Sequence, residues 1–396
     1  MKNNWQTKKL GEVCRIEKKQ NSSFLPYVGL EDIESNTGRF LGTTEVREVK
    51  SNTFYFTSSH VLYGRLRPYL NKVFLPEFDG HCSTEIFPII PNNLLDRKFL
   101  FYWLTTNETV DKINSTCTGA RMPRANMNEV IDFEIPVPPI QEQKRIVAIL
   151  DQAFADIEKL RANTERNLKN ARELFESYAK KVLFSTARGW IESTIGKECN
   201  LMTGGTPSKT EKKYFDNGTI RWLVSGDVHK GIIEDCEGRI TKLGLANSNA
   251  KYLPTNSVVI ALNGQGKTRG TVALLKVEAT CNQSIVSIFP KESSGIFSEY
   301  ILLNLQSRYN EIRKMTGDSG NDRRGLNMPL IRSIKISFPS SYEEQQNMIR
   351  KLTILKELNN DLVLRYQEKI NYLDQLKKSI LQKAFTGQLT KHEVTV

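Results

Sequence analysis

The chain has little of the material from which metal centres and disulfide frameworks are made. Its 396 residues include only four His, and its six Cys lie far apart with no Cys-x-x-Cys pair. Structural zinc sites need several closely spaced Cys and His ligands, and disulfide frameworks are typical of secreted proteins. We therefore expect no metal site, and a reduced, cytoplasmic compartment.

Long apolar runs are also missing. No segment approaches the roughly 20 apolar residues of a transmembrane helix, and the N-terminus shows no apolar signal region. Positive charge is present instead, because 56 Lys and Arg stand against 44 Asp and Glu, a net charge of +12. That balance favours a polyanionic partner, nucleic acid first and a membrane surface second.

Two long segments contain neither Pro nor Gly. They run from 140 to 188 and from 340 to 386, and apolar residues recur in both at alternating steps of four and three. This is the heptad pattern of a coiled coil, so we predict two helices of about 45 residues, each roughly 68 Å long. Helices of this length need a partner, and we expect them to pack antiparallel against each other.

The predicted seam of this helix pair takes five residues from each helix: Ile146, Leu150, Ile157, Leu160 and Asn167 from the first, and Leu352, Leu355, Asn359, Leu362 and Ile380 from the second. A register that matches Ile146 to Ile380 brings Asn167 opposite Asn359, and a buried Asn pair can fix register. The outer faces would then expose further apolar residues to protein partners, namely Ile149, Leu168, Phe175, Val182 and Leu183.

The rest of the chain also occurs twice. Trp5, Gly11 and Cys14 recur 185 residues later, with Ile195 in the place of Leu10, and Cys82-Ser-Thr-Glu-Ile86 parallels Cys281-Asn-Gln-Ser-Ile285. The spacing between the copies grows to 201 residues at Arg124 and Gly325, as small loop insertions in the second copy would produce. The chain is therefore predicted to be a tandem duplication of one unit.

Each copy is predicted to have a globular part followed by a long helix. Residues 258–261, 271–275 and 284–289 have the composition of strands, whereas 96–113 and 298–315 have that of amphipathic helices. The predicted class is α+β, with two globular domains joined by two long antiparallel coiled-coil helices in a pseudo-two-fold tandem repeat. The expected ranges are 1–138, 139–188, 189–340 and 341–388, with a tail at 389–396.

Catalytic motifs are scarce. Ala261-Leu-Asn-Gly-Gln-Gly-Lys-Thr268 would be a phosphate-binding loop if residue 261 were Gly, but a strand rather than a helix is expected after it. No Gly-rich fingerprint for a dinucleotide or S-adenosylmethionine is present. We expect no catalytic residue and no cofactor in this chain, which has the features of a binding and assembly protein.

Loops that combine Gly with cations occur at matching places in both globular parts. Arg provides a planar fork for a guanine edge, and Lys suits phosphates. The alternative for any single cation is a solvated surface charge. The candidate DNA-binding residues are Arg65, Arg67, Arg121 and Arg124 in the first globular part and Lys209, Lys267, Arg269, Arg323 and Arg324 in the second.

Taken together, the chain resembles the specificity subunit of type I restriction–modification systems. The resemblance rests on Ile135-Pro-Val-Pro-Pro-Ile-Gln-Glu-Gln-Lys-Arg-Ile146, on 376–389, and on the openings Leu10-Gly-Glu-Val-Cys14 and Gly204-Gly-Thr-Pro-Ser208. The second helix departs from the pattern, because Phe338-Pro-Ser-Ser-Tyr342 replaces the Pro-Pro form.

The resemblance implies a non-catalytic DNA-recognition subunit. Each globular part would be a target recognition domain for one half of a bipartite double-stranded DNA sequence, and the helices would set the spacer. The helices would also hold two modification (methyltransferase) subunits, joined by restriction (translocase and endonuclease) subunits. S-adenosylmethionine, ATP and Mg would belong to these partners, and no membrane is involved. The alternatives are a stand-alone DNA-binding regulator and a nucleotide-dependent enzyme that uses the loop at 261–268.

Overall fold

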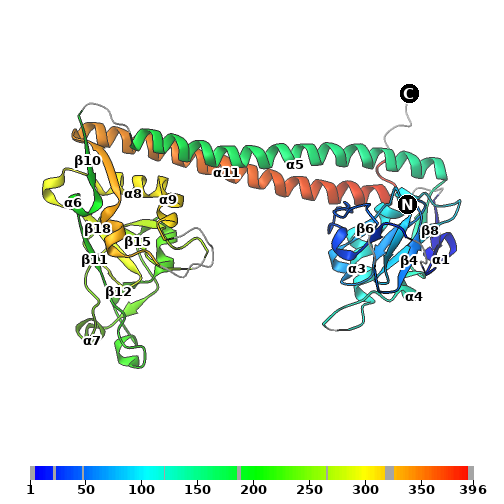
Figure 1. Ribbon diagram of the computed structural model, residues 1–396, viewed down its shortest axis with the longest axis horizontal. Coiled ribbons are helices and arrows are strands. Elements are labelled where there is room, and N and C mark those ends of the chain that lie inside the picture. The colour runs from blue at the N-terminus through cyan, green and yellow to red at the C-terminus, as the bar shows by residue number, and fades with distance from the viewer. Residues whose placement is uncertain are drawn as a thin grey trace. The chain divides into compact units, whose positions relative to one another are not determined.

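The computed structural model describes residues 5–20, 24–46, 49–119, 121–184, 189–264, 266–316 and 325–390. The chain divides into two compact units, Met1–Glu165 with Gln367–Val396 (unit 1) and Arg166–Tyr366 (unit 2). Each unit contains one globular part and one end of each long helix, α5 (Ile140–Leu183) and α11 (Tyr342–Phe385), as Figure 1 shows. The predicted long helices are therefore present, each with 44 residues.

The globular part of unit 1 is built from short strands and helices. Its strands are β1 (Gln6–Lys9), β2 (Cys14–Ile16), β3 (Tyr27–Val28), β4 (Thr53–Phe56), β5 (Val61–Gly64), β6 (Val73–Phe74), β7 (Gly80–Ser83), β8 (Ile86–Pro91) and β9 (Glu134–Val137). Its helices are α1 (Leu10–Val13), η1 (Leu30–Asp32), η2 (Pro68–Leu70), α2 (Arg97–Leu104), α3 (Asn107–Ser115) and α4 (Met127–Val130). The strands form sheets in the orders β2-β8-β5-β6, β3-β7-β4 and β1-β9.

Unit 2 repeats this plan with additions. Its strands are β10 (Trp190–Thr194), β11 (Cys199–Thr203), β12 (Ile220–Leu223), β13 (Ile232–Ile233), β14 (Arg239–Ile240), β15 (Val258–Ala261), β16 (Val272–Leu275), β17 (Thr280–Cys281), β18 (Ile285–Pro290) and β19 (Lys335–Pro339). Its helices are α6 (Ile195–Glu198), η3 (Lys212–Tyr214), η4 (Ser225–Lys230), α7 (Lys242–Ala246), η5 (Glu292–Ser294), α8 (Ser298–Ser307), α9 (Tyr309–Lys314) and α10 (Met328–Ser333). The sheet orders are β11-β18-β15-β16-β13, β14-β12-β17 and β10-β19.

Strand register shows that the two units share one fold. Cys14 pairs with Pro91 between β2 and β8, and Cys199 pairs with Pro290 between β11 and β18. The parallel pairs β3–β7 and β12–β17 also correspond. The units differ at the edge of the small sheet, where β4 pairs with β7 in unit 1 but β14 pairs with β12 in unit 2. The predicted α+β class and tandem repeat are confirmed.

The two amphipathic helices predicted at 96–113 and 298–315 are each divided in the structure. In unit 1, α2 ends before Thr105, and the Thr106 side chain accepts a hydrogen bond from the Thr109 N–H at the start of α3. Thr is a favoured N-cap because its hydroxyl satisfies an amide at the helix start. In unit 2 the division lies at Arg308, between α8 and α9. The amphipathic pattern continues across both breaks, so periodicity alone did not reveal them.

The ends of the long helices belong to the hydrophobic cores of the globular parts. In unit 1, Ile146 and Leu150 of α5 and Leu381 of α11 are buried in one cluster with Phe99 and Tyr63. Unit 2 buries Leu183 and Leu352 with residues of α8 and β15 in the same way. Full burial of a Leu side chain is worth about 1.5–3 kcal/mol. Each globular part is therefore built around the helix ends.

Two buried glutamines mark equivalent points on the long helices. The Gln143 side chain accepts from the Asp96 N–H at 2.7 Å and donates to the carbonyls of Leu94 and Pro138, both at 2.8 Å. Gln345 accepts from the Phe297 N–H and donates to the carbonyls of Gly295 and Pro339. Gln345 follows Gln143 by 202 residues, so a residue of α5 corresponds to the α11 residue numbered 202 higher.

Within unit 1 the two long helices run antiparallel. Glu158 pairs with Lys377 at 3.5 Å, and Arg161, three residues further along α5, pairs with Asp374, three residues earlier in α11. A step forward on one helix thus matches a step back on the other. This arrangement confirms the predicted direction of the pair.

The predicted seam is only partly correct on α5. The strip with Leu150 and Ile157, together with Ile146, is buried, and it continues through Thr164. The second predicted strip faces outward, because Leu160 is 46% and Leu174 is 72% exposed and Asn167 is also exposed. Residues one position further along replace this strip, and they are half-buried: Phe154, Arg161, Leu168 and Phe175.

The same correction applies to α11. Leu352 is buried and Ile380 and Asn359 are half-buried, but Leu355 and Leu362 are 38% and 40% exposed. Apolar residues flank the shared strip on both sides, so spacing did not decide which flank is inside. The inner flank is the one that packs on the globular cores. The residues predicted to lie on the outer face are accordingly half-buried (Ile149, Leu168, Phe175, Val182) or buried (Leu183).

An exposed Asn167 also overturns the predicted buried pair of Asn167 with Asn359. Thr164, which is buried, holds the neighbouring seam position, and its hydroxyl donates to the Leu160 carbonyl at 2.7 Å. A side chain that bonds its own helix contributes little to helix register. Among the described residues, no helix combines the length and apolar character that crossing a membrane requires.

Candidate nucleic-acid interface

Two loops of unit 1 that lie far apart in the sequence meet next to strand β5. The Ala125 N–H donates to the Arg65 carbonyl at 2.9 Å, and the Arg67 N–H donates to the Pro123 carbonyl at 2.7 Å. These bonds join the loop after β5 to the segment before α4. Three of the four predicted arginines of this unit, Arg65, Arg67 and Arg124, therefore lie on adjoining backbone, and Arg121 lies on the same segment.

Glu85 links two of these arginines. It sits in the turn between β7 and β8, where its carboxylate lies 3.0 Å from Arg65 Nε and 2.9 Å from Arg124 Nη2. The Arg65 guanidinium also lies over the Phe87 ring, 5.1 Å from its centroid. A carboxylate shared by two guanidinium groups holds both in a fixed orientation. Sequence reasoning missed Glu85, although it lies within the repeated segment at 82–86.

The charge state of this cluster follows from its surroundings. Burial of Glu85 by itself raises its pKa, but the hydrogen bonds and charges of Arg124 and Arg65 outweigh that effect, so its pKa lies below the ordinary value. Glu85 is therefore ionised at neutral pH. Among the described residues, no hydrogen bond engages the two Nη groups of Arg65, so these donors are open to a ligand.

Arg67 and Arg121 are exposed and make no ion pair with a described residue. Arg67 has a left-handed backbone, with φ of 52°, which is uncommon for a residue with a side chain. The hydrogen bond from its N–H to the Pro123 carbonyl therefore helps to fix the loop. The two residues provide exposed cations beside the Glu85 cluster, and these suit phosphates better than base edges.

Unit 2 has the same backbone arrangement but different side chains. The Leu262 N–H donates to the Ser284 carbonyl and the Leu326 N–H donates to the Leu262 carbonyl, as Arg65 and Ala125 do with Glu85 and Arg65 in unit 1. Leu262, Ser284 and Gly325 thus occupy the places of Arg65, Glu85 and Arg124. The acid–arginine cluster belongs to unit 1 alone at these positions.

The two predicted DNA-binding cations of the loop after β15 differ in exposure. Lys267 is exposed, and its carbonyl accepts from the Tyr309 hydroxyl at 2.8 Å. His229 Nε2 lies 3.0 Å from the Thr268 hydroxyl, which anchors the loop on η4. Arg269, by contrast, is only 8% exposed, so it presents little surface to DNA in this structure, and its contact with DNA stays a prediction.

Lys209 lies in a second loop of unit 2 that reaches the β17–β18 turn. The Thr206 hydroxyl donates to Gln283 at 2.6 Å, and the Gly205 N–H donates to the Cys281 carbonyl at 3.0 Å. A Cβ at Gly204 would lie 1.9 Å from the Cys281 carbonyl oxygen, so only Gly allows this close approach. Lys209 itself is exposed. Arg323 and Arg324 lie outside the described residues.

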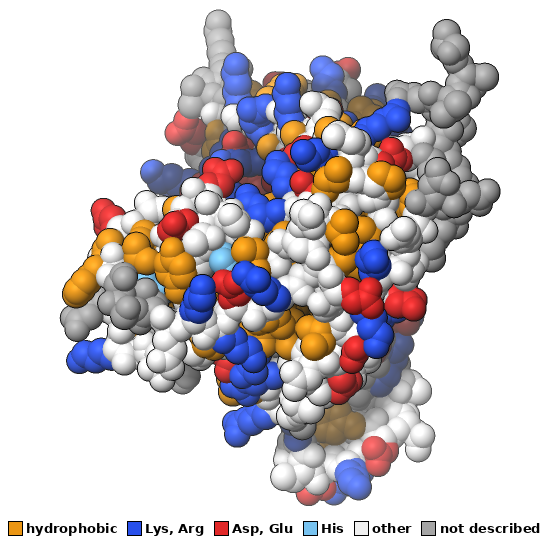
Figure 2. All heavy atoms as spheres, turned by 90° about the vertical axis from the view of Figure 1, so that its right-hand side faces the viewer, with side chains coloured by type: hydrophobic (Ala, Val, Ile, Leu, Met, Phe, Trp, Pro, Cys, Tyr) orange, Lys and Arg blue, Asp and Glu red, His pale blue; other side chains and the backbone are white. Residues whose placement is uncertain are grey.

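The loop at 261–268 does not have the structural surroundings of a nucleotide-binding loop. The element that follows the loop at 261–268 is strand β16, whereas a phosphate-binding loop leads into a helix N-terminus. Among the described residues, no group of three or more His, Cys, Asp or Glu is arranged to hold a metal ion. On the face seen in Figure 2, Lys and Arg side chains are spread among Asp and Glu rather than gathered in one patch.

Comparison with known proteins identifies the family of this chain. The family model of the type I restriction modification DNA specificity domain matches residues 2–166 and 187–372. The specificity subunit of the type I restriction enzyme EcoR124I/EcoR124II from Escherichia coli is 26% identical over 293 residues, which cover 72% of this chain and 70% of the relative.

Solved structures show the same fold. One, from work on complex assembly and conformational transition of the type I R-M system, has a TM-score of 0.82 at 22% identity and covers 98% of this chain and 99% of its own. The HsdS subunit from Thermoanaerobacter tengcongensis has a TM-score of 0.65 at 21% identity, with 98% of both chains covered. With both halves matched in tandem, the chain belongs to the family of the type I restriction modification DNA specificity domain.

Proposed function

We propose that this chain is the non-catalytic DNA-recognition subunit of a type I restriction–modification complex, in which each globular part reads one half of a bipartite target. One observation carries the proposal: the two units present the same loop backbone with different side chains at its equivalent positions. A shared scaffold with different side chains is what two unlike half-sites require.

Unit 1 has the chemistry for direct base reading. Arg65 and Arg124 are oriented by Glu85 before any ligand binds, and a preorganised guanidinium suits the O6 and N7 acceptors of guanine in the major groove. Arg67 and Arg121, which are exposed, would contact phosphates. In unit 2, Lys209 and Lys267 supply the exposed cations, beside the polar side chains of Thr206 and Gln283.

The long helices would set the spacer and hold the partner subunits. A helix of 44 residues is about 66 Å long, which corresponds to roughly 20 base pairs at about 3.4 Å each. Exposed apolar side chains recur along both long helices, and large exposed apolar patches mark interaction surfaces. We define the outer strip as the exposed residues Leu160, Leu174 and Tyr178 of α5 and Leu355, Leu358, Leu362 and Leu376 of α11.

The outer strip fits the expected modification subunits, which would carry S-adenosylmethionine and methylate adenine. ATP and Mg would belong to the restriction subunits. This chain would contribute recognition and assembly, and the reacting groups would come from its partners.

The proposal is tested by co-expressing the chain with candidate modification subunits from the same organism. Leu174→Asp and Leu358→Asp should reduce co-purification at least tenfold, because each places a charge in the outer strip. Asn170→Asp and Asn360→Asp introduce the same charge at exposed polar positions of the same helices and serve as controls. Sequence-specific DNA binding by the lone chain, with no complex formed by any variant, would contradict the proposal and favour a stand-alone regulator.

A further inference from the structure

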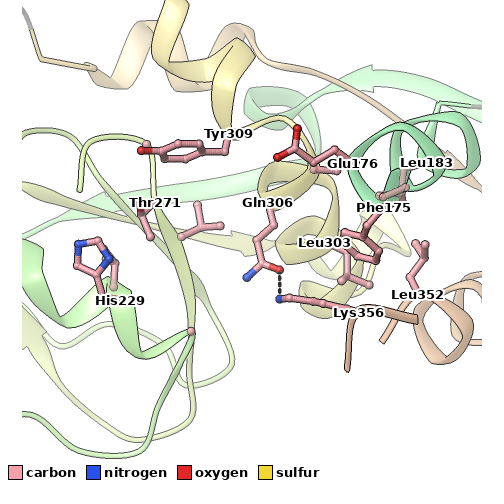
Figure 3. A pocket seen from close by; sticks show the side chains of 16 residues that line it. Phe175, Glu176, Leu183, His229, Thr271, Leu303, Gln306, Tyr309, Leu352 and Lys356 are labelled. Atoms are coloured by element: carbon pink, nitrogen blue, oxygen red, sulfur yellow. Dashed lines mark hydrogen bonds between the residues drawn. The ribbon is translucent and has the colours of Figure 1, made fainter. Parts of the chain in front are cut away.

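Unit 2 contains a cavity of about 350 Å³ beneath the long helices. Figure 3 shows its lining, in which the apolar side chains Phe175, Leu303 and Leu352 lie near the polar pair Gln306 and Lys356. Small-molecule sites in proteins have volumes of about 300–1,000 Å³ and are mostly apolar with a few placed polar groups. The cavity has both properties.

Lys356 is the unusual member of this lining. It is half-buried, its Nζ donates to the Gln306 side-chain carbonyl at 2.6 Å, and it makes no ion pair with a described residue. Burial lowers its pKa, because desolvation disfavours the ammonium form. Glu176 also lines the cavity but is exposed and is not paired with Lys356. The ammonium group thus lies in a partly desolvated place with no anionic partner in the described part of the chain.

Unit 1 has a different arrangement of side chains at the equivalent place. Phe154 lies 202 residues before Lys356, and Lys377 lies 202 residues after Phe175, so unit 1 has the aromatic and the lysine on exchanged helices. Phe154 packs edge-on against Tyr102, with ring centroids 5.5 Å apart, and Lys377 Nζ lies 5.1 Å from the Phe154 centroid.

Unit 2 also has a Leu where unit 1 has a Tyr. Phe297, bonded by Gln345, corresponds to Asp96, bonded by Gln143, and follows it by 201 residues. The same spacing brings Leu303 to the place of Tyr102. The exchange of Phe and Lys keeps one Phe at this place in each unit, so the net change in unit 2 is the loss of one ring beside the cavity, where Leu303 replaces Tyr102.

We propose that this cavity binds a small amphipathic carboxylate, whose apolar body would lie among Phe175, Leu303 and Leu352 and whose carboxylate would pair with Lys356 Nζ. Charge complementarity supports this class of ligand, since a desolvated ammonium with only a neutral partner gains most from an anion. The apolar body would lie where Leu303 of unit 2 replaces the larger Tyr102 of unit 1.

The test is isothermal titration of the full chain with 4-phenylbutyrate, compared with the neutral 4-phenylbutanol. The carboxylate should bind at least tenfold more tightly than the alcohol. Lys356→Met should remove this difference, and Lys356→Phe, which introduces the unit 1 side chain, should abolish binding of both. Lys351→Met removes an exposed lysine from the same helix and should leave both affinities unchanged.

Circular dichroism and thermal unfolding would check that each variant is folded. Absence of 4-phenylbutyrate binding at millimolar concentration would overturn the proposal. Equal affinity for the acid and the alcohol, or unchanged binding of the acid by folded Lys356→Met, would also overturn it. None of these results bears on DNA recognition.

Discussion

Units 1 and 2 differ where they would meet a ligand and agree where they fold. Backbone bonds around β5 and β15 correspond, and Gln143 and Gln345 make the same three contacts with the segments they join. The loop side chains, in contrast, change from an acid–arginine cluster to Leu262, Ser284 and Gly325. The comparison shows that this fold separates the residues that build it from the residues that give it specificity.

The largest expected effect tests the shared core. Leu150→Ala and Leu352→Ala remove equivalent buried side chains from the two units, and each should lower the free energy of unfolding by about 2–5 kcal/mol. Urea unfolding measures the loss. Leu358→Ala, at an exposed position of the same helix as Leu352, should cost little. A cost in one unit and none in the other would contradict the equivalence.

A smaller effect should separate the two half-sites. Arg65→Ala or Arg124→Ala in the assembled complex should weaken binding of the cognate sequence by about 1–3 kcal/mol and relax one half-site only. Selection from a random DNA library, followed by sequencing, measures both. Arg39→Ala changes an exposed arginine of the same unit that pairs with Glu34 and is the control. Equal weakening on all sequences would instead mean that these arginines contact phosphates.

Exchange of the side chains around the cavity should make unit 2 more like unit 1. Lys356→Phe fills the cavity and removes a partly desolvated charge, so it should stabilise the chain by about 0.5–2 kcal/mol. Thermal unfolding at neutral pH measures the gain, with Lys351→Phe as an exposed control. A loss of stability in Lys356→Phe alone would mean that Phe cannot adopt the packing that Phe154 has in unit 1.

The smallest expected effect concerns acid. Because the pKa of Glu85 is lowered in the folded chain, its ion pairs contribute stability above its ordinary pKa of about 4.5, and this contribution is lost as the pH falls through the folded value. Partly exposed pairs of this kind are worth about 1 kcal/mol or less. The difference in unfolding free energy between the wild type and Glu85→Gln should therefore shrink from pH 7 to pH 3. A constant difference would remove the ionic explanation.

Much of this fold could be predicted from sequence because the same motifs and the same long helical segment occur twice in the chain. The absence of Pro and Gly from 140 to 188 and from 340 to 386 predicted both long helices, and paired motifs predicted two copies of one unit. The inner face of the helices could not be predicted, since apolar residues flank Leu150 and Ile157 on both sides. The cores of the globular parts decide which flank is buried, and those cores are formed by long-range contacts.

The candidate interface was predictable in part for a similar reason. Gly and Arg clusters indicated which loops carry cations, but an exposed Lys267 and a buried Arg269 have the same sequence signal. Glu85 could not be predicted as the partner of Arg65 and Arg124, because it lies 20 and 39 residues away from them in the sequence. The predicted domain boundaries stay predictions, since the compact units each draw on both long helices.

Genome-wide adenine methylation, measured by single-molecule sequencing with and without this gene, tests the central claim most directly. Recognition of two unlike half-sites predicts the loss of methylation at one motif, composed of two short sequences around a fixed gap. An unchanged methylome in cells that express the modification subunits would contradict a role in recognition for that complex.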